Sequence, residues 1–381
     1  MPFNQHPASE LVLNVAFPCT LAAPNYGAAQ PYVKESPEKA RYVDAVEAEL
    51  GALDEDIRTR PIVALRLSGG ASIMKADKVL HLVKSLKKTL AVQPRAQIAI
   101  DVEPLTVCTP SLSDWTSCGI NRVNFNVWSV IDKELAAFGA QHDREQVQNA
   151  MLFMDKFHMD NVNVRLLVGL PGQTRGGLRE SVLSFATLGY PHITLLPLAE
   201  DDPARAAELP DRAACRELWQ MACEELAKQG YEEYLVGSFV AKGHPHARDV
   251  FETAQRTGAG VLALGAGARN RYDGFLYENV AAFNTYVNHA DDFETIVRNP
   301  RREGADVAEL RAALGALDLL EGFTASDLAQ ACGVEAADPA VQAWLDARAN
   351  AGLLACEDGT YSYTAEGRFA RALELARDLR F

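Results

Sequence analysis

The chain has 381 residues, of which 48% are hydrophobic and 23% charged, a composition typical of an ordinary globular protein. Its formal net charge is −14, and because an acidic chain repels phosphate backbones we expect no nucleic-acid partner. No run of about 18 apolar residues occurs and "MPFNQHPASE" lacks the pattern of a signal peptide, so we expect a cytoplasmic protein without a membrane span.

Strand-like and helix-like segments alternate over the first 200 residues. The expected strands are 11–17, 62–70, 97–104, 122–129, 162–174 and 192–200, and the expected helices are 37–53, 76–90, 111–118 and 143–158. Strands separated by helices of this length indicate a parallel sheet with crossover helices. Six such units predict an α/β fold, a partial (β/α)6 barrel of the TIM type.

The pattern changes near residue 300. The polar stretch "NPRREGADVAEL" leads into expected helices over 306–320, 325–332 and 339–352, followed by a turn-rich ribbon and a final helix. Helices followed by a two-stranded wing are typical of a small winged-helix-like domain. We therefore expect a barrel domain over 1–295, extended from about residue 200, and a C-terminal domain over 305–381.

Local motifs occur in an order that resembles the oxygen-independent coproporphyrinogen III oxidase family of radical S-adenosylmethionine (SAM) proteins, and within it the heme chaperones. The motifs are "LSGGAS" (67–72), "IAIDVEP" (98–104), "GINRVNFNVWS" (119–129), "VGLPGQT" (168–174), "KQGYEEYLVGSF" (228–239), "LALGAGARN" (262–270) and "TAEGR" (364–368). None of them is specific alone, but their number and order cover nearly the whole chain.

This resemblance implies a [4Fe–4S] cluster held by Cys-x3-Cys-x2-Cys after the first strand, with SAM on the open iron. The corresponding positions here are Cys19, Ala23 and Tyr26. One thiolate cannot hold a cubane, so we expect a degenerate form in which Cys19 is the lone remnant of the metal site. The cluster and radical cleavage of SAM are therefore not expected in this chain.

The SAM-binding positions that the resemblance implies are partly kept. Gly69, Gly70 and Asp101 match glycines and a carboxylate of the family, whereas Trp128 replaces a glutamine and Arg165 replaces an acidic residue. A reversal of charge inside a barrel inverts the local field, so SAM binding is not expected. We interpret these five residues as remnants of the SAM site or as the lining of a pocket.

Two of these positions leave alternatives open. Arg165 forms an ion pair with Asp101 or Glu103, or it binds a ligand carboxylate such as a porphyrin propionate. Trp128 fills space, or it stacks on a flat ligand. Two loop histidines, His244 and His246, are candidate axial ligands of heme, although a solvated pair is the simpler interpretation.

The resemblance implies a heme-chaperone-like protein that binds or delivers a tetrapyrrole such as heme, with no catalytic residues of its own. Alternatives are a SAM-binding or coproporphyrinogen-oxidase-like oxidoreductase of porphyrin metabolism, and a non-catalytic partner subunit of an active homologue. The partners expected are thus a tetrapyrrole or another small molecule, together with a protein partner under the last alternative.

Overall fold

The computed structural model describes residues 10–17, 19–20, 30–31, 37–198, 209–302, 315, 317–318, 320, 322–331 and 339–378. Six parallel strands lie side by side in chain order and form the partial barrel. They are β1 (Leu11–Phe17), β4 (Ile62–Gly69), β5 (Val92–Val102), β6 (Arg122–Trp128), β7 (Val162–Val168) and β8 (His192–Pro197). The predicted (β/α)6 architecture is confirmed.

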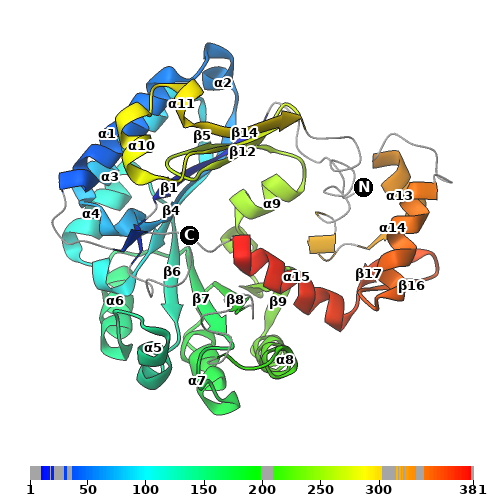
Figure 1. The fold of residues 1–381 in the computed structure, drawn as a ribbon. Coiled ribbons are helices and arrows are strands. Elements are labelled where there is room, and N and C mark those ends of the chain that lie inside the picture. Colours follow the sequence, from blue (N-terminus) through cyan, green and yellow to red (C-terminus); the bar gives the residue numbers. More distant parts are fainter. Residues whose placement is uncertain are drawn as a thin grey trace.

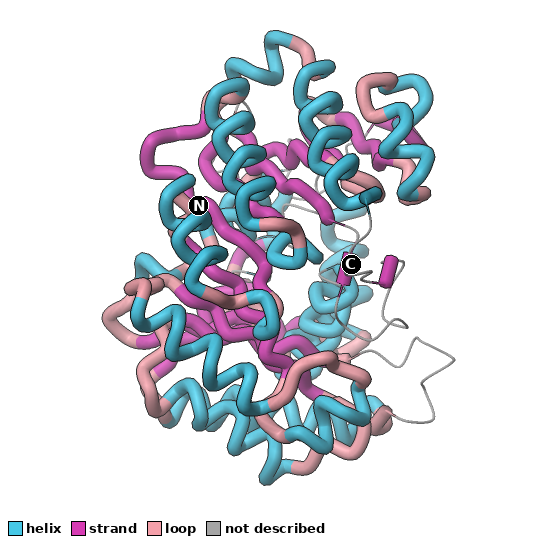
Figure 2. Tube along the Cα trace, turned by 90° about the vertical axis from the view of Figure 1, so that its left-hand side faces the viewer, coloured by secondary structure: helices cyan, strands magenta, loops and turns pink. Residues whose placement is uncertain are grey.

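Helices cover the outer face of these strands, as Figures 1 and 2 show from two directions. They are α1 (Pro37–Ala52), α2 (Glu55–Thr59), α3 (Ala76–Thr89), α4 (Thr109–Cys118), α5 (Asp132–Phe138), α6 (Arg144–Lys156), α7 (Arg175–Ala186) and α8 (Arg212–Lys228). Alternate strand residues such as Leu65, Leu67, Ile98 and Ile100 belong to the main apolar core with these helices. The intervening residues face the barrel interior.

Both ends of the six-stranded sheet are extended rather than joined to each other. At one end β11 (Gly260–Leu264) runs parallel to β1 and continues into antiparallel strands, and at the other β10 pairs antiparallel with β8. The remaining strands are β9 (Tyr231–Leu235), β10 (Ser238–Ala241), β12 (Arg269–Tyr272), β13 (Phe275–Asn279) and β14 (Val297–Arg302). Short helices α9 (Val250–Arg256), α10 (Phe283–His289) and α11 (Phe293–Ile296) connect them, and α9 contacts β1 and β4.

The C-terminal elements have a small core of their own. They are β15 (Phe323–Thr324), α13 (Ala325–Ala331), α14 (Pro339–Asn350), β16 (Leu354–Glu357) and β17 (Thr360–Tyr363), and the strands form a three-stranded antiparallel sheet. The final helix, α15 (Ala365–Asp378), instead packs on the barrel, because Phe369, Ala372 and Leu373 are buried in the main core (Figure 1).

The observed strand ends differ from the predicted ones in places. β5 begins five residues earlier than predicted, because its start contains Pro94 and exposed polar residues that hide the strand pattern. β7 ends at Val168, since Gly169 and Gly172 adopt φ values of +90° and +69° that turn the chain. Most of the helix expected over 306–320 lies outside the described residues. No helix in the described part of the chain combines the length and apolar character that a membrane span needs.

Candidate functional site

The barrel interior is polar and charged. Strand alternation turns four charged residues inward, and each of them is at most 4% exposed. They are Arg66 of β4, Asp101 of β5, Glu103 just after β5, and Arg165 of β7. Burial of a charge is costly unless it is paired, so the interior must supply the partners.

Asp101 is the centre of this network. Arg66 donates from Nε to Oδ1 at 3.2 Å and from Nη2 to Oδ2 at 2.9 Å, while Arg165 Nη1 lies 3.0 Å from Oδ2. Asn124 Nδ2 donates to Oδ1 at 2.9 Å, and the backbone N–H of Gly69 donates to Oδ2 at 3.3 Å. Burial alone would raise the pKa of Asp101, but the charges of Arg165 and Arg66 hold it well below its ordinary value. Asp101 is therefore an ionised carboxylate whose acceptor capacity is in use.

The structure thus contains the ion pair expected between Arg165 and Asp101, and it adds a second cation that was not anticipated. Arg66 also pairs with Glu252 of α9, at 3.1 Å. Arg66 stands at an inward position of the predicted strand 62–70, which marks it as a buried charge. Its partner on α9 could not be read from the sequence because the two residues are 186 positions apart.

Glu103 lies beyond Asp101, where β5 ends. Its Oε1 accepts a hydrogen bond of 2.9 Å from Asn126 Nδ2, whereas its Oε2 has no hydrogen-bond partner among the described residues. Its backbone N–H donates to Ser72 Oγ at 3.1 Å. Burial raises the pKa of Glu103 to about 7, so its carboxyl group is near half protonation at neutral pH.

An apolar cluster lies at the carboxyl ends of β6, β7 and β8, and we call it the mouth cluster. Its buried members are Trp128, Leu135, Phe138, Leu167, Leu170, Leu196, Leu198 and Ala376. Trp128 has a φ of +64°, an uncommon and strained conformation for a tryptophan, and its indole Nε1 has no hydrogen-bond partner in the part of the chain that the structure describes. Ala376 comes from α15, so the last helix contributes one side of the barrel mouth (Figure 1).

Gly69 and Gly70 end β4 beside this network. Gly69 has a φ of +71°, which directs its N–H toward Asp101, and Gly70 starts a buried 3-10 turn, Gly70–Ile73. Cys19 lies in β2 (Cys19–Thr20), which pairs with β3 (Gln30–Pro31). Ala23 and Tyr26 lie outside the described residues.

The histidines lie in two settings. His244 and His246 are exposed, 5.4 Å apart between ring centroids, in the loop after β10. Because β10 is antiparallel to β8, this loop lies at the amino-terminal end of the barrel, opposite the mouth. His192 is buried and its Nε2 lies 2.8 Å from the hydroxyl of Tyr234, while burial and the charge of Arg122 hold its pKa well below the ordinary value. It acts there as a neutral structural group.

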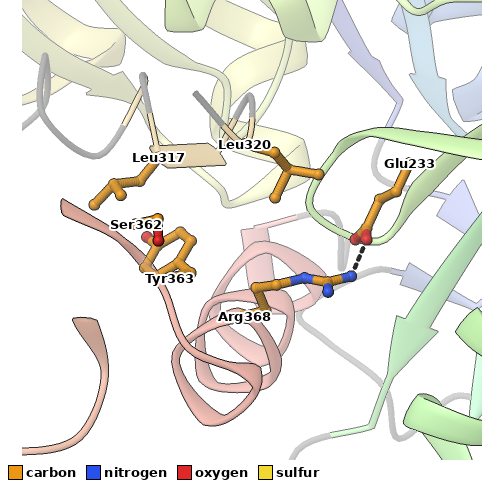
Figure 3. A pocket seen from close by; sticks show the side chains of 6 residues that line it. All are labelled: Glu233, Leu317, Leu320, Ser362, Tyr363 and Arg368. Atoms are coloured by element: carbon orange, nitrogen blue, oxygen red, sulfur yellow. Dashed lines mark hydrogen bonds and ion pairs between the residues drawn. The ribbon is translucent and has the colours of Figure 1, made fainter. Parts of the chain in front are cut away.

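A separate cavity of about 370 Å³ lies where the barrel meets the C-terminal elements (Figure 3). Its lining residues are Glu233, Leu317, Leu320, Ser362, Tyr363 and Arg368. Arg368 and Glu233 form an ion pair on its wall. None of the residues predicted for the site lines this cavity.

Comparison with known proteins confirms the resemblance drawn from the motifs. The chain is 24% identical over 231 residues to the heme chaperone HemW of Haemophilus influenzae, covering 59% of this chain and 60% of the relative. It is 23% identical over 257 residues to heme chaperone HemW of Lactococcus lactis, covering 64% and 67%. The match thus spans well short of the full length of these relatives. No protein-family model matches the chain.

The fold is that of a solved radical SAM enzyme. Coproporphyrinogen III oxidase HemN of Escherichia coli superimposes with a TM-score of 0.81 at 18% identity, over 99% of this chain and 91% of the enzyme. The C-terminal elements and α15 are included in this likeness. At 18% identity the match shows the fold alone, so the chemistry has to be inferred from the residues of the site.

Those residues do not fit the cofactors of radical SAM enzymes. The cluster positions offer one thiol, an alanine and a tyrosine, a donor set that cannot hold three irons. The carboxylate that the resemblance assigns to the ribose side of SAM, Asp101, is already occupied by two guanidinium groups and an amide. SAM carries a positive charge at its sulfonium, so it would be a third cation beside Arg66 and Arg165 and would be repelled in this buried setting.

Proposed function

We propose that this chain is a heme-chaperone-like protein that binds a tetrapyrrole such as heme at the barrel mouth, without radical chemistry. The names of its relatives support the ligand class, because the matched proteins are heme chaperones. The proposal assigns no catalytic residue, because a chaperone retains and transfers its ligand unchanged.

The observation that carries the proposal is the mouth cluster. A tetrapyrrole presents a flat apolar ring, and apolar side chains with a few polar groups beside them are typical of small-molecule sites. Trp128, Leu196 and Leu198 are apolar side chains of this kind, 6–8% exposed, at the carboxyl ends of the strands, where barrels bind their ligands. The strained backbone of Trp128 is consistent with a functional position.

The ion-pair network around Asp101 supports the absence of SAM chemistry. Arg66 and Arg165 neutralise the carboxylate that a radical SAM enzyme would keep for its cofactor. The carboxylate of Asp101 is then paired without SAM, and the side chains of the mouth cluster are apolar. We propose that the fold has kept a tetrapyrrole site and has lost the binding of SAM and of the iron–sulfur cluster.

A hemin titration followed at the Soret band tests this function. We expect the wild-type chain to bind hemin and Trp128→Ala to bind it roughly tenfold more weakly, because an aromatic contact contributes about 0.5–1.5 kcal/mol beyond its burial. Phe275→Ala is the matched control, since Phe275 is an aromatic residue 41% exposed on β13, away from the mouth.

The histidine variants distinguish the two ends of the barrel. We expect His244→Ala and His246→Ala to bind hemin as the wild type does, because their loop is opposite the mouth. A loss of the Soret shift in these variants with normal binding by Trp128→Ala would move the site to the loop. Absence of any Soret shift in the wild type would refute the function.

Two expectations from the sequence belong to the same proposal. One is a cytoplasmic location, where a heme carrier would meet its acceptors. The other is the division into a barrel domain over 1–295 and a small domain over 305–381. The separate core around Phe323 and Leu345 supports it, whereas α15 of the same range packs into the main core.

A further inference from the structure

Arg165 is the least neutralised cation of the barrel interior. It shares the carboxylate of Asp101 with Arg66, and Arg66 has Glu252 as a second anionic partner. Arg165 has no second ion pair among the described residues, and it forms none with Glu103. Two guanidinium groups therefore divide one carboxylate, and Arg165 is the one left with the smaller share.

The hydrogen bonds of Arg165 leave the same deficit. A guanidinium has five N–H donors on three nitrogens. Nη1 donates to Asp101 and, at 3.3 Å, to the side-chain oxygen of Asn126. No hydrogen bond joins Nε or Nη2 to a described residue, and neither nitrogen is among the fully buried atoms that lack a partner. A guanidinium with unused donors is suited to bind a carboxylate in a two-point contact.

The charge of Glu103 does not fill this gap. Its carboxyl has one amide partner and one unpaired oxygen, and burial raises its pKa to about 7. It is therefore neutral in much of the population at neutral pH. Among the described residues Arg165 forms an ion pair with Asp101, which it shares with Arg66, while Asp249 adds a weaker charge interaction.

Arg165 lies directly below the mouth cluster. Leu167, a member of that cluster, follows two residues later on β7 and points to the same side of the sheet. Two residues of a parallel strand span about 6.6 Å. A ligand that contacts Leu167 of the mouth cluster therefore lies about this far from the strand position of Arg165. A propionate arm has this length and ends in the acceptor pair that a guanidinium binds best.

We infer that Arg165 is the anchor for one ligand carboxylate, so that the barrel takes a tetrapyrrole through a propionate as well as through its ring. This inference rests on the proposed function and adds to it the recognised group. It implies selection for ligands with a free acid arm and against their esters. The replacement of an acidic residue by Arg165, inferred from the motif resemblance, then changes a cation site into an anion site.

The test compares hemin with hemin dimethyl ester, which keeps the iron and the ring but lacks both carboxylates. We expect the wild type to bind hemin at least tenfold more tightly than the ester, because a hydrogen bond between a guanidinium and a carboxylate is stronger than one to a neutral ester. Arg165→Gln is expected to lower the affinity for hemin to that for the ester and to leave the ester unchanged. Arg165→Lys, which keeps the charge, should retain part of the preference.

The outcomes separate this inference from the function on which it rests. Equal affinity of the wild type for hemin and its ester would overturn the role of Arg165 while leaving tetrapyrrole binding in place, and this comparison needs no variant to fold. Failure of both ligands to bind would overturn the function and the inference together. Arg144→Gln is the matched control, because Arg144 is an exposed arginine that pairs with Glu180 on the outer helices.

Discussion

Glu103→Gln is expected to remove a pH-dependent loss of stability. Burial raises the pKa of this carboxyl from 4.5 to about 7 in the folded chain. In the unfolded chain it ionises near 4.5, so between these values the unfolded state binds fewer protons and stability falls as the pH rises. At about 1.4 kcal/mol for each pKa unit, the full difference corresponds to about 3 kcal/mol of unfolding free energy.

Glutamine suits the site because it keeps the acceptor for Asn126 and replaces only the oxygen that has no partner. Urea unfolding at pH values from 5 to 8 measures the effect. We expect the wild type to lose about 2.5 kcal/mol more than Glu103→Gln over this range, because a part of the difference is already lost at pH 5. Glu49, whose pKa burial also raises to about 7, titrates in both proteins and cancels. Glu180→Gln on the surface should follow the wild type, and parallel curves for Glu103→Gln and wild type would refute the reasoning.

Three further substitutions test the packing around the site. Asp101→Asn leaves two buried arginines without their shared anion and should cost about 3–5 kcal/mol in urea unfolding; a cost below 1 kcal/mol would mean that the network is not formed. Asp318→Asn removes the 1% exposed partner of Arg256 and Arg371 and should increase proteolytic cleavage between barrel and C-terminal elements, whereas an unchanged cleavage pattern would contradict this. Gly265→Ala places a Cβ 2.4 Å from the carbonyl oxygen of Ala16 at a φ of +110°, so a lower melting temperature is expected and an unchanged one would speak against it.

The six barrel strands could be predicted because each is an apolar run followed by a helical pattern. What the sequence could not give is the pairing at the two ends of the sheet, where β11 joins β1 from 250 residues away and the antiparallel strands follow. Short half-exposed strands such as β12 and β14 carry no apolar alternation, so local pattern does not reveal them.

A part of the candidate site could be predicted because its residues stand in recognisable motifs on predicted strands. Asp101 and Arg165 could be placed on facing strands from their motifs, and their ion pair is present. The ion pair of Arg66 with Glu252 and the place of Ala376 in the mouth cluster depend on how α9 and α15 pack on the barrel, which local sequence does not encode. The positive φ of Trp128 likewise follows from tertiary structure, because tryptophan has no preference for that conformation.

The most direct measurement is an anaerobic hemin titration of the purified chain before and after treatment with iron and sulfide. We predict a shifted Soret band at about one hemin per chain in both samples. We also predict that the treatment adds no iron–sulfur absorption, because Cys19 alone cannot hold a cubane. A brown protein with about four irons per chain that cleaves SAM to 5′-deoxyadenosine would contradict it.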